Sequence, residues 1–256
     1  MKIAVLFDGA GLARLGLEQA GHKCTGVELD PWKVHLGLLV GSGNVIQGDA
    51  TKFNLCDFDA VWASPPCARR TSCIKDLTHA DGLRNPEFQH DYLKWCIQAV
   101  ECYQGKIWWI ENVTQQGANQ SDNAYNAAQF LREPIQCRNR IILGNHGAPK
   151  VFRRYLRHYP DLNLCPTITA TEYKASGATD RCRASLWYKR NLTVEECAFH
   201  QGFKIPRKWF DVPEKFESHL KEEYRVSRWR KRLYEAIGDG VPVYMARSFG
   251  EVYRGR

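Results

Sequence analysis

Short apolar segments alternate with amphipathic segments through the first half of the chain. Five short apolar runs predict strands, at Lys2–Phe7, Cys24–Glu28, Val45–Gln47, Ala60–Ala63 and Ile107–Ile110. Between them, the spacing of apolar positions predicts helices at Leu12–Ala20, Pro31–Val40 and Pro86–Tyr103, and the second of these starts with a proline in its first turn. Strands that alternate with helices predict an α/β fold with a doubly wound, mostly parallel, Rossmann-like sheet.

The pattern changes after about residue 135. Arg140–Leu143 predicts one more strand, whereas residues 144–165 are irregular and basic. Further helices are expected over residues 192–201, Lys215–Ile237 and Val241–Phe249. We therefore expect a main domain over residues 1–143, a small irregular lobe over 144–236, and a C-terminal segment, 237–256, that returns to the main domain.

Size and charge narrow the class of protein. A chain of 256 residues has room for one α/β domain and a small appendage. Its start does not resemble a signal peptide and its apolar runs are too short to cross a bilayer, so we expect a soluble, cytoplasmic protein. The formal net charge of +8 favours an anionic partner, of which nucleic acid is the commonest.

The ten cysteines follow no metal-binding or disulfide pattern. None are spaced as CxxC, and no Cys/His cluster has zinc-finger spacing. This indicates reduced thiols and no bound metal. We expect most of them to be small core residues, namely Cys24, Cys56, Cys96, Cys102 and Cys197.

Three polar or glycine-rich positions at successive strand ends describe a nucleoside pocket. The turn Phe7-Asp8-Gly9-Ala10-Gly11 lets the backbone approach a ligand closely and opens a helix N-terminus. Glu28 ends the next strand, where a carboxylate can accept hydrogen bonds from ribose hydroxyls, and Asp49 follows the third, where it can receive an adenine amino group. The chain has neither a Walker lysine motif nor a complete GxGxxG, which disfavours ATP and NAD.

Two further strand ends carry reactive groups. Ser64-Pro65-Pro66-Cys67 places a thiol directly after two stiff prolines, and Glu111-Asn112-Val113 follows the fifth predicted strand. Because parallel strands end at one edge of a sheet, this pattern predicts a nucleophile beside an acid.

These motifs together resemble those of the DNA cytosine-C5 methyltransferases, in family order over nearly the whole chain. The turn at 7–11, Glu28-Leu29-Asp30 and Gly48-Asp49-Ala50-Thr51 match the cofactor motifs, Pro66-Cys67 the nucleophile motif and Glu111-Asn112-Val113 the glutamate motif. Gln136-Cys137-Arg138-Asn139-Arg140 matches QxRxR, Arg190–Cys197 with Gln201-Gly202-Phe203 the ninth motif, and Ile237–Pro242 the last.

The resemblance implies a class I methyltransferase that uses S-adenosylmethionine and no metal. It implies the catalytic residues Cys67, Glu111, Arg138 and Arg140. The cofactor would contact Phe7, Gly9, Gly11, Leu12, Glu28, Leu29, Asp49, Ala50, Pro66, Asp239 and Val241.

The implied chemistry explains why these residue types are needed. The Cys67 thiolate adds to C6 of a cytosine flipped out of the duplex, while Glu111, kept protonated by burial, stabilises N3. C5 then becomes nucleophilic enough to take the methyl group. Loss of the C5 proton and expulsion of Cys67 restore aromaticity. Arg140 contacts the base and assists the thiolate.

The chain departs from the family in three places. Ala68 stands for a glutamine after the nucleophile, followed by Arg69 and Arg70, which suit an electrostatic clamp on DNA. Asp239 replaces an asparagine in the last motif, which leaves an altered donor or product open. Only 22 residues, Gly144 to Cys165, stand where the family has a target recognition domain.

So short a segment predicts little direct base recognition. Its arginines Arg153, Arg154 and Arg157 suit phosphate contacts, which position DNA without reading sequence. The Arg181–Arg183 segment and a basic helix can add to the same surface, the latter with Arg225, Arg228, Arg230, Lys231 and Arg232.

Two other functions remain open at this point. One branch of the family methylates tRNA, and a non-catalytic nucleic-acid-binding relative would keep the same fold. We favour a monomeric enzyme acting on DNA. The residues do not indicate its target sequence or biological role.

Overall fold

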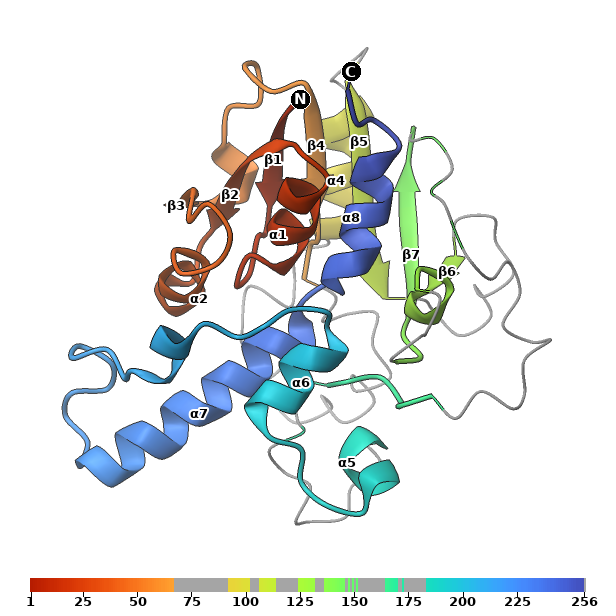
Figure 1. Ribbon diagram of the computed structural model, residues 1–256. Helices are drawn as coiled ribbons and strands as arrows, with labels where there is room; N and C mark the ends of the chain where they lie inside the picture. Colours follow the sequence, from red (N-terminus) through yellow and green to blue (C-terminus); the bar gives the residue numbers. More distant parts are fainter. Residues whose placement is uncertain are drawn as a thin grey trace.

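The computed structural model describes residues 1–66, 92–101, 106–113, 124–131, 136–145, 147, 149, 151, 164–169, 172 and 183–255. Its centre is one seven-stranded sheet in the order β3-β2-β1-β4-β5-β7-β6 (Figure 1). The strands are β1 (Lys2–Leu6), β2 (Lys23–Glu28), β3 (Val45–Gln47), β4 (Ala60–Ala63), β5 (Ile107–Val113), β6 (Ala124–Asn126) and β7 (Asn139–Gly144).

The first five strands are parallel, and β7 runs antiparallel to both of its neighbours. Strand β4 is buried along its whole length, as expected for a central strand covered on both faces. The prediction of a doubly wound, mostly parallel α/β sheet is confirmed.

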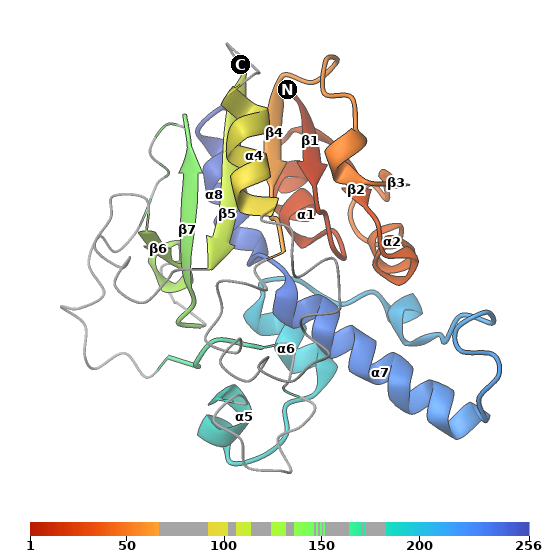
Figure 2. The same ribbon diagram turned by 180° about the vertical axis from the view of Figure 1, so that it is seen from behind.

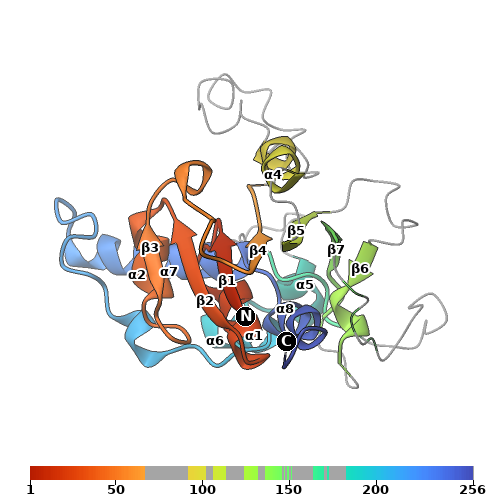
Figure 3. The ribbon, with the colours of Figure 1, turned by 90° about the horizontal axis from the view of Figure 1, so that it is seen from above.

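Helices cover both faces of the sheet. The described helices are α1 (Leu12–Gln19), α2 (Pro31–Gly37), α4 (Tyr92–Glu101), α5 (Arg183–Tyr188), α6 (Val194–His200), α7 (Glu222–Asp239) and α8 (Val243–Glu251). The view from above shows α1 and α8 together on one face and α4 on the other (Figure 3). Short 3₁₀ helices lie at Ala50–Lys52, Ala127–Gln129 and Arg207–Phe210.

A glycine allows the first and last helices to pack closely. A Cβ on Gly16 of α1 would lie 2.3 Å from the carbonyl oxygen of Val243 in α8, so only glycine fits. Beneath these helices, the ring centroids of Trp62 and Trp109 are 5.9 Å apart, and Phe249 of α8 packs edge-on against Trp62. Full burial of each such ring contributes on the order of 2 kcal/mol or more. Helix α8, in the C-terminal segment, therefore packs onto the sheet.

A second group of helices lies beyond the carboxyl ends of the parallel strands. Figures 1 and 2 place α5, α6 and α7 below this edge of the sheet, and α7 extends past the side that carries α2 and β3. Trp209, Phe216 and Trp229 are fully or almost fully buried here, and Trp32 of α2 packs edge-on against Phe216 with ring centroids 5.0 Å apart. This aromatic cluster fixes α7 against α2.

Several boundaries differ from those predicted. Strand β5 continues through Glu111 to Val113, because β7 pairs with this extension. Helix α2 ends at Gly37 instead of Val40. Helix α7 begins at Glu222 instead of Lys215, because Arg225 donates hydrogen bonds to the carbonyls of the preceding 213–216 segment and holds it as turns.

The sequence analysis also missed β6 and α5, which are too short to show a clear periodicity. Cys24, Cys96 and Cys197 are buried as predicted. Cys56 is exposed, so its prediction as a core residue is wrong, and Cys102 lies outside the described residues.

Within the described ranges, none of the helices has both the length and the apolar character needed to cross a membrane. The same ranges contain no group of three or more His, Cys, Asp or Glu side chains arranged to hold a metal ion.

Candidate active site

The turn after β1 has a backbone that leaves room for a ligand. Phe7, Gly9 and Gly11 have φ angles of 56°, 59° and 85°, all in the left-handed region. A Cβ on Gly9 would meet no atom within 4 Å, so open space lies beside the turn. Phe7 adopts this conformation without being glycine, and such local strain is concentrated at functional sites.

A buried ion pair holds this turn in place. Nε of Arg14 on α1 lies 2.9 Å from Oδ2 of Asp8, and both side chains are completely buried. Burial raises the pKa of Asp8 to about 6, although the guanidinium acts in the opposite direction. Arg14 also donates to the carbonyl oxygens of Gly37 and Val40, which ties the turn to the end of α2. The sequence analysis missed Arg14; its signal is a charged residue between the apolar positions of the helix, six residues after Asp8.

The end of β2 presents a fixed carboxylate beside the turn. One oxygen of Glu28 accepts the backbone N–H of Gly9 at 2.8 Å, and the other accepts that of Asp30 at 2.9 Å. A carboxylate oxygen has two lone-pair sites, so each can accept one more hydrogen bond. The carboxylate can therefore receive a diol while its position stays fixed.

Apolar surface adjoins this carboxylate. Leu29 is 57% exposed and Ile46, on β3, is 45% exposed. A Cβ on Gly48, at the end of β3, would also meet nothing within 4 Å. Open space, exposed aliphatic side chains and a diol acceptor together fit the nucleoside part of S-adenosylmethionine.

Asp49 and Ala50 begin the short helix after β3. One oxygen of Asp49 accepts the N–H and the hydroxyl of Thr51, which lowers the pKa of Asp49. The other lies 3.4 Å from Nζ of Lys52. Ala50 is buried in the core. Asp49 thus serves as a helix cap, and its other oxygen has the Lys52 ammonium as its neighbour.

Glu111 and Arg140 form a close pair at the junction of β5 and β7. The register pairs Glu111 with Ile142 and Val113 with Arg140, which makes Glu111 and Arg140 diagonal neighbours. Nε of Arg140 lies 2.6 Å from Oε1 of Glu111, and the two side chains are only 11% and 9% exposed. The antiparallel strand thus brings the predicted acid and the predicted base-contacting arginine into direct contact.

Asn112 connects this pair to the proline segment. Its side-chain amide donates to the carbonyl oxygen of Pro65 at 3.1 Å, so the ends of β4 and β5 are joined. Pro66 is exposed at the edge of the sheet. Cys67 follows Pro66 directly in the sequence but lies outside the described residues, as do Arg69, Arg70, Arg153, Arg154 and Arg157. The sequence analysis gave Asn112 no role, because only the register shows what its amide reaches.

Arg138 points away from Glu111, toward the last motif. Its guanidinium donates to the carbonyl oxygens of Ile168, Gly238 and Gly240, and it is 1% exposed. Burial, together with the nearby positive charge of Arg140, lowers the pKa of Arg138 to about 9. The described contacts of Arg138 are therefore structural: it holds the turn between α7 and α8.

Two glutamines extend this network to the ninth motif. The side-chain amide of Gln136 donates to the carbonyl oxygen of His200 and to the side chain of Gln201, and that of Gln201 donates to the carbonyl oxygen of Ile237. These hydrogen bonds connect the QxRxR segment, the ninth motif and the last motif.

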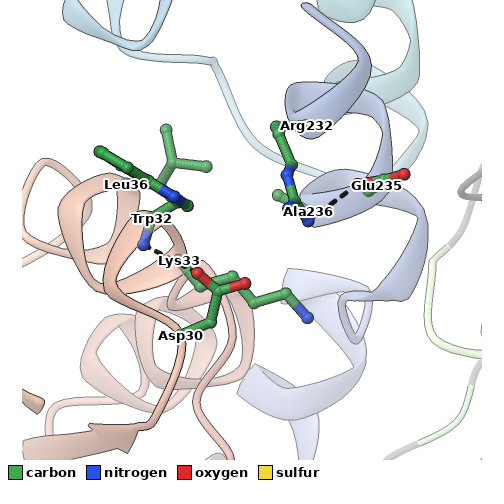
Figure 4. A pocket seen from close by; sticks show the side chains of 7 residues that line it. All are labelled: Asp30, Trp32, Lys33, Leu36, Arg232, Glu235 and Ala236. Atoms are coloured by element: carbon green, nitrogen blue, oxygen red, sulfur yellow. Dashed lines mark hydrogen bonds and ion pairs between the residues drawn. The ribbon is translucent and has the colours of Figure 1, made fainter. Parts of the chain in front are cut away.

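The segment Ile237–Pro242 lies against the start of α1. A Cβ on Gly240 would lie 2.5 Å from Cδ1 of Leu12, so the two segments touch, and Val241 is buried beside them. Asp239 lies 3.6 Å from Nζ of Lys33 on α2. Figure 4 shows Lys33 extending between α2 and α7, next to Asp30. Burial acts to lower the pKa of Lys33, but the carboxylates of Asp239, Glu28 and Asp30 together outweigh it and raise that pKa.

Lys33 had no place in the predicted site. It is one of several charged residues on a predicted helix, and nothing in its sequence position marks its contact with Asp239.

Comparison by sequence gives no relative: no protein-family model and no curated protein matches the chain. Comparison of structures gives clear matches. S. pombe Dnmt2 methyltransferase aligns at a TM-score of 0.57 and 13% identity, with 96% of each chain covered. The Entamoeba histolytica methyltransferase EhMeth aligns at 0.59 and 13%, with 98% of this chain and 97% of that one covered. A prophage-encoded E. coli protein, named as a candidate DNA modification methyltransferase, aligns at 0.56 and 15%, with 99% and 98% covered.

The chain has the fold of these methyltransferases. The likeness extends over almost the full length of each, so it includes the helices beyond the carboxyl edge as well as the sheet. The low identities limit it to the fold, and the chemistry depends on the residues described above.

Proposed function

We propose that the protein transfers a methyl group from S-adenosylmethionine to C5 of cytosine in DNA. The observation that carries the proposal is the Glu111–Arg140 pair, 2.6 Å apart and nearly buried, joined through Asn112 to the strand end that precedes Cys67. A carboxyl group next to a guanidinium suits the N3 and carbonyl edge of a cytosine. Cys67, which follows Pro66 directly in the sequence, would attack C6 from the face of the ring.

Each residue has a defined task in this proposal. Cys67, as a thiolate, attacks C6 of the flipped cytosine. Glu111, which pairs with Arg140 in the free protein, must take up a proton when the base binds and then stabilises the negative charge at N3. Arg140 orients Glu111 and contacts the base. Arg138 acts indirectly, because its hydrogen bonds hold the turn that carries Asp239 and Gly240.

The cofactor would lie along the ends of β1, β2 and β3. Glu28 would accept the ribose hydroxyls, Leu29 would pack against the adenine, and the turn at Gly9 would leave space for the chain of the cofactor. When bound there, S-adenosylmethionine supplies an electrophilic methyl group.

One observation favours DNA over tRNA as the substrate. The net charge of +8 suits a polyanion of either kind and does not discriminate between them. One structural neighbour is named as a candidate DNA modification methyltransferase. A tRNA methyltransferase of the same fold is the alternative, and a non-catalytic binder would have no use for the Glu111–Arg140 pair.

Methyl transfer from labelled S-adenosylmethionine tests the proposal directly. Duplex DNA and tRNA would be offered in parallel, and the position of the label would be determined by nucleoside analysis. We expect labelled 5-methylcytosine in DNA. Label only in tRNA would replace the substrate assignment, and no label in either would overturn the proposed activity.

Glu28→Ala should weaken cofactor binding by about tenfold or more, because a lost hydrogen-bonded carboxylate removes roughly 1.5–3 kcal/mol. Calorimetric titration with S-adenosylmethionine measures the dissociation constant. Asp57→Ala, at an exposed carboxylate on the amino-terminal side of β4, is the matched control and should bind normally. An unchanged dissociation constant for Glu28→Ala would remove Glu28 from the site.

The target sequence should be short, on the order of two to four base pairs, because few side chains are available to discriminate base edges at about 1–3 kcal/mol each. This prediction depends on the shortness of the segment from Gly144 to Cys165. Bisulfite sequencing of DNA from cells that express the protein gives the methylated context. A strict site of six or more base pairs would contradict it.

A further inference from the structure

The net positive charge is concentrated on one part of the lobe. Residues 204–232 contain ten Lys and Arg against five Asp and Glu, an excess of five in a chain whose total is +8. All of these residues are described, and α7 carries half of the basic ones. The question is which of them form a surface.

Arg225 is held by the fold, because it donates to the carbonyl oxygens of Pro213, Glu214 and Phe216. Arg230 is exposed, but the helical period places it on the opposite side of α7 from Arg228. The remaining three basic residues of α7, Arg228, Lys231 and Arg232, have the i, i+3, i+4 spacing that places side chains on one helix face. Tyr224, 57% exposed, lies one turn before Arg228 on the same face. We call these four residues the α7 stripe.

The charges on this stripe point outward. Arg228 pairs with Glu217, and Lys231 and Arg232 both pair with Glu235. The basic side chains are 58%, 47% and 43% exposed, whereas the two carboxylates are 25% and 26% exposed. The acids therefore lie beneath the bases, and the outer layer that a partner meets is positive.

The position of the stripe relates it to the site. Arg232 and Glu235 line a small pocket with Asp30, Trp32 and Lys33 of α2, and Asp239 at the end of α7 pairs with Lys33 (Figure 4). The stripe thus begins beside the strand that carries Glu28. Three strand spacings separate β2 from β5, so Glu111 lies about 14 Å away across the sheet. This offset suits contact with DNA that flanks a target base.

We propose that the α7 stripe binds the phosphate backbone of duplex DNA flanking the target cytosine; this rests on the proposed function. The stripe runs from Tyr224 to Arg232, nine residues and about 12 Å of helix, which matches roughly three phosphates of one strand. An exposed tyrosine beside the basic side chains adds a hydroxyl donor to a phosphate or sugar. Such contacts replace some of the affinity that a recognition domain would supply.

The triple variant Arg228→Gln/Lys231→Gln/Arg232→Gln tests the proposal. Binding to a labelled duplex is measured by fluorescence anisotropy over a series of salt concentrations. Each lost phosphate contact lowers the slope of log affinity against log salt by about 0.9, so the slope should become shallower by about two to three. Affinity near 0.1 M salt should fall roughly tenfold or more. The KM for DNA should rise while kcat at saturating DNA stays unchanged.

Two controls separate this surface from general effects of charge. Lys2→Gln/Lys23→Gln/Arg247→Gln removes the same charge from exposed positions on the opposite, amino-terminal edge and on α8, and should keep the wild-type slope. Arg228→Lys/Arg232→Lys keeps the charge and should also keep the slope. The proposal would be overturned if the variant of the α7 stripe kept the wild-type salt dependence. It would also be overturned if the Lys2/Lys23/Arg247 control lost as much salt dependence as the stripe variant.

The two proposals fail separately. Suppose that the wild-type protein transfers no methyl group, but that the triple variant shows a shallower dependence of DNA affinity on salt. DNA binding by the α7 stripe is then supported, and the proposed methyl transfer is wrong. If the triple variant instead loses binding to phosphatidylserine vesicles and binds DNA normally, the stripe faces a membrane and the proposal is wrong.

Discussion

Cys67→Ser should abolish methyl transfer, with a loss of about 10⁴-fold or more, because a serine hydroxyl ionises far less readily than a thiol and cannot supply the attacking anion. Methylation of duplex DNA with labelled cofactor, under single-turnover conditions, measures the loss. Binding of S-adenosylmethionine and of DNA should remain, since neither depends on the sulfur atom.

A mechanism-based trap gives the second measurement for this position. DNA that contains 5-fluorocytosine cannot lose its C5 substituent as a proton, so the wild-type protein should remain covalently attached to it. Cys67→Ser should form no adduct, and Cys56→Ser, which changes an exposed thiol elsewhere, should form a normal one. Substantial methylation or trapping by Cys67→Ser would show that another group is the nucleophile.

The sheet could be predicted from the sequence because its signals are local. Four of the five strands predicted in the first half end within one residue of their actual bounds, since each is a compact apolar run followed by a glycine, proline or acidic residue. The end of β5 was missed for a non-local reason. Its last three residues, from Glu111, are strand only because β7 pairs with them.

The difference between local sequence signals and non-local contacts also applies to the site. The motif series identified Glu111 and Arg140, but the sequence does not show that they touch; that follows from an antiparallel register. Arg138 is in the same motif, yet its side chain reaches carbonyls a hundred residues later in the chain. Arg138 and Arg140 thus have different contacts although they belong to one motif, and only the three-dimensional structure shows this difference.

The lobe was the hardest part to predict. Its sequence is polar and basic, and the segment before α7 was expected to be helical because its composition permits it. Arg225 instead holds the carbonyl groups of this segment, so that the helix begins only at Glu222. Tertiary hydrogen bonds, which no local pattern records, decide the boundary and so decide which basic residues of α7 are exposed.

Glu111→Gln should lower the methylation rate by about 10²-fold or more, the scale of a lost general acid. The structure indicates that this substitution removes the acidic proton without disturbing the neighbouring contacts. Glutamine has nearly the shape of glutamate and keeps a carbonyl oxygen that can accept the hydrogen bond from Nε of Arg140, so the contact between β5 and β7 should survive. What the variant lacks is an acidic proton to place at N3 of the cytosine.

The loss in Glu111→Gln should therefore appear in kcat, with the dissociation constants for DNA and S-adenosylmethionine close to those of the wild-type protein. Thermal unfolding monitored by circular dichroism checks that the fold is retained. Asn112→Ala is the informative partner variant, because it removes the amide that joins β5 to Pro65 and leaves the acid in place. It should reduce the rate by disturbing the position of the chain before Cys67, while the pH dependence of the remaining activity stays that of the wild-type protein. Near-normal kcat in Glu111→Gln would leave Glu111 as a structural partner of Arg140 and would require another proton donor for the base.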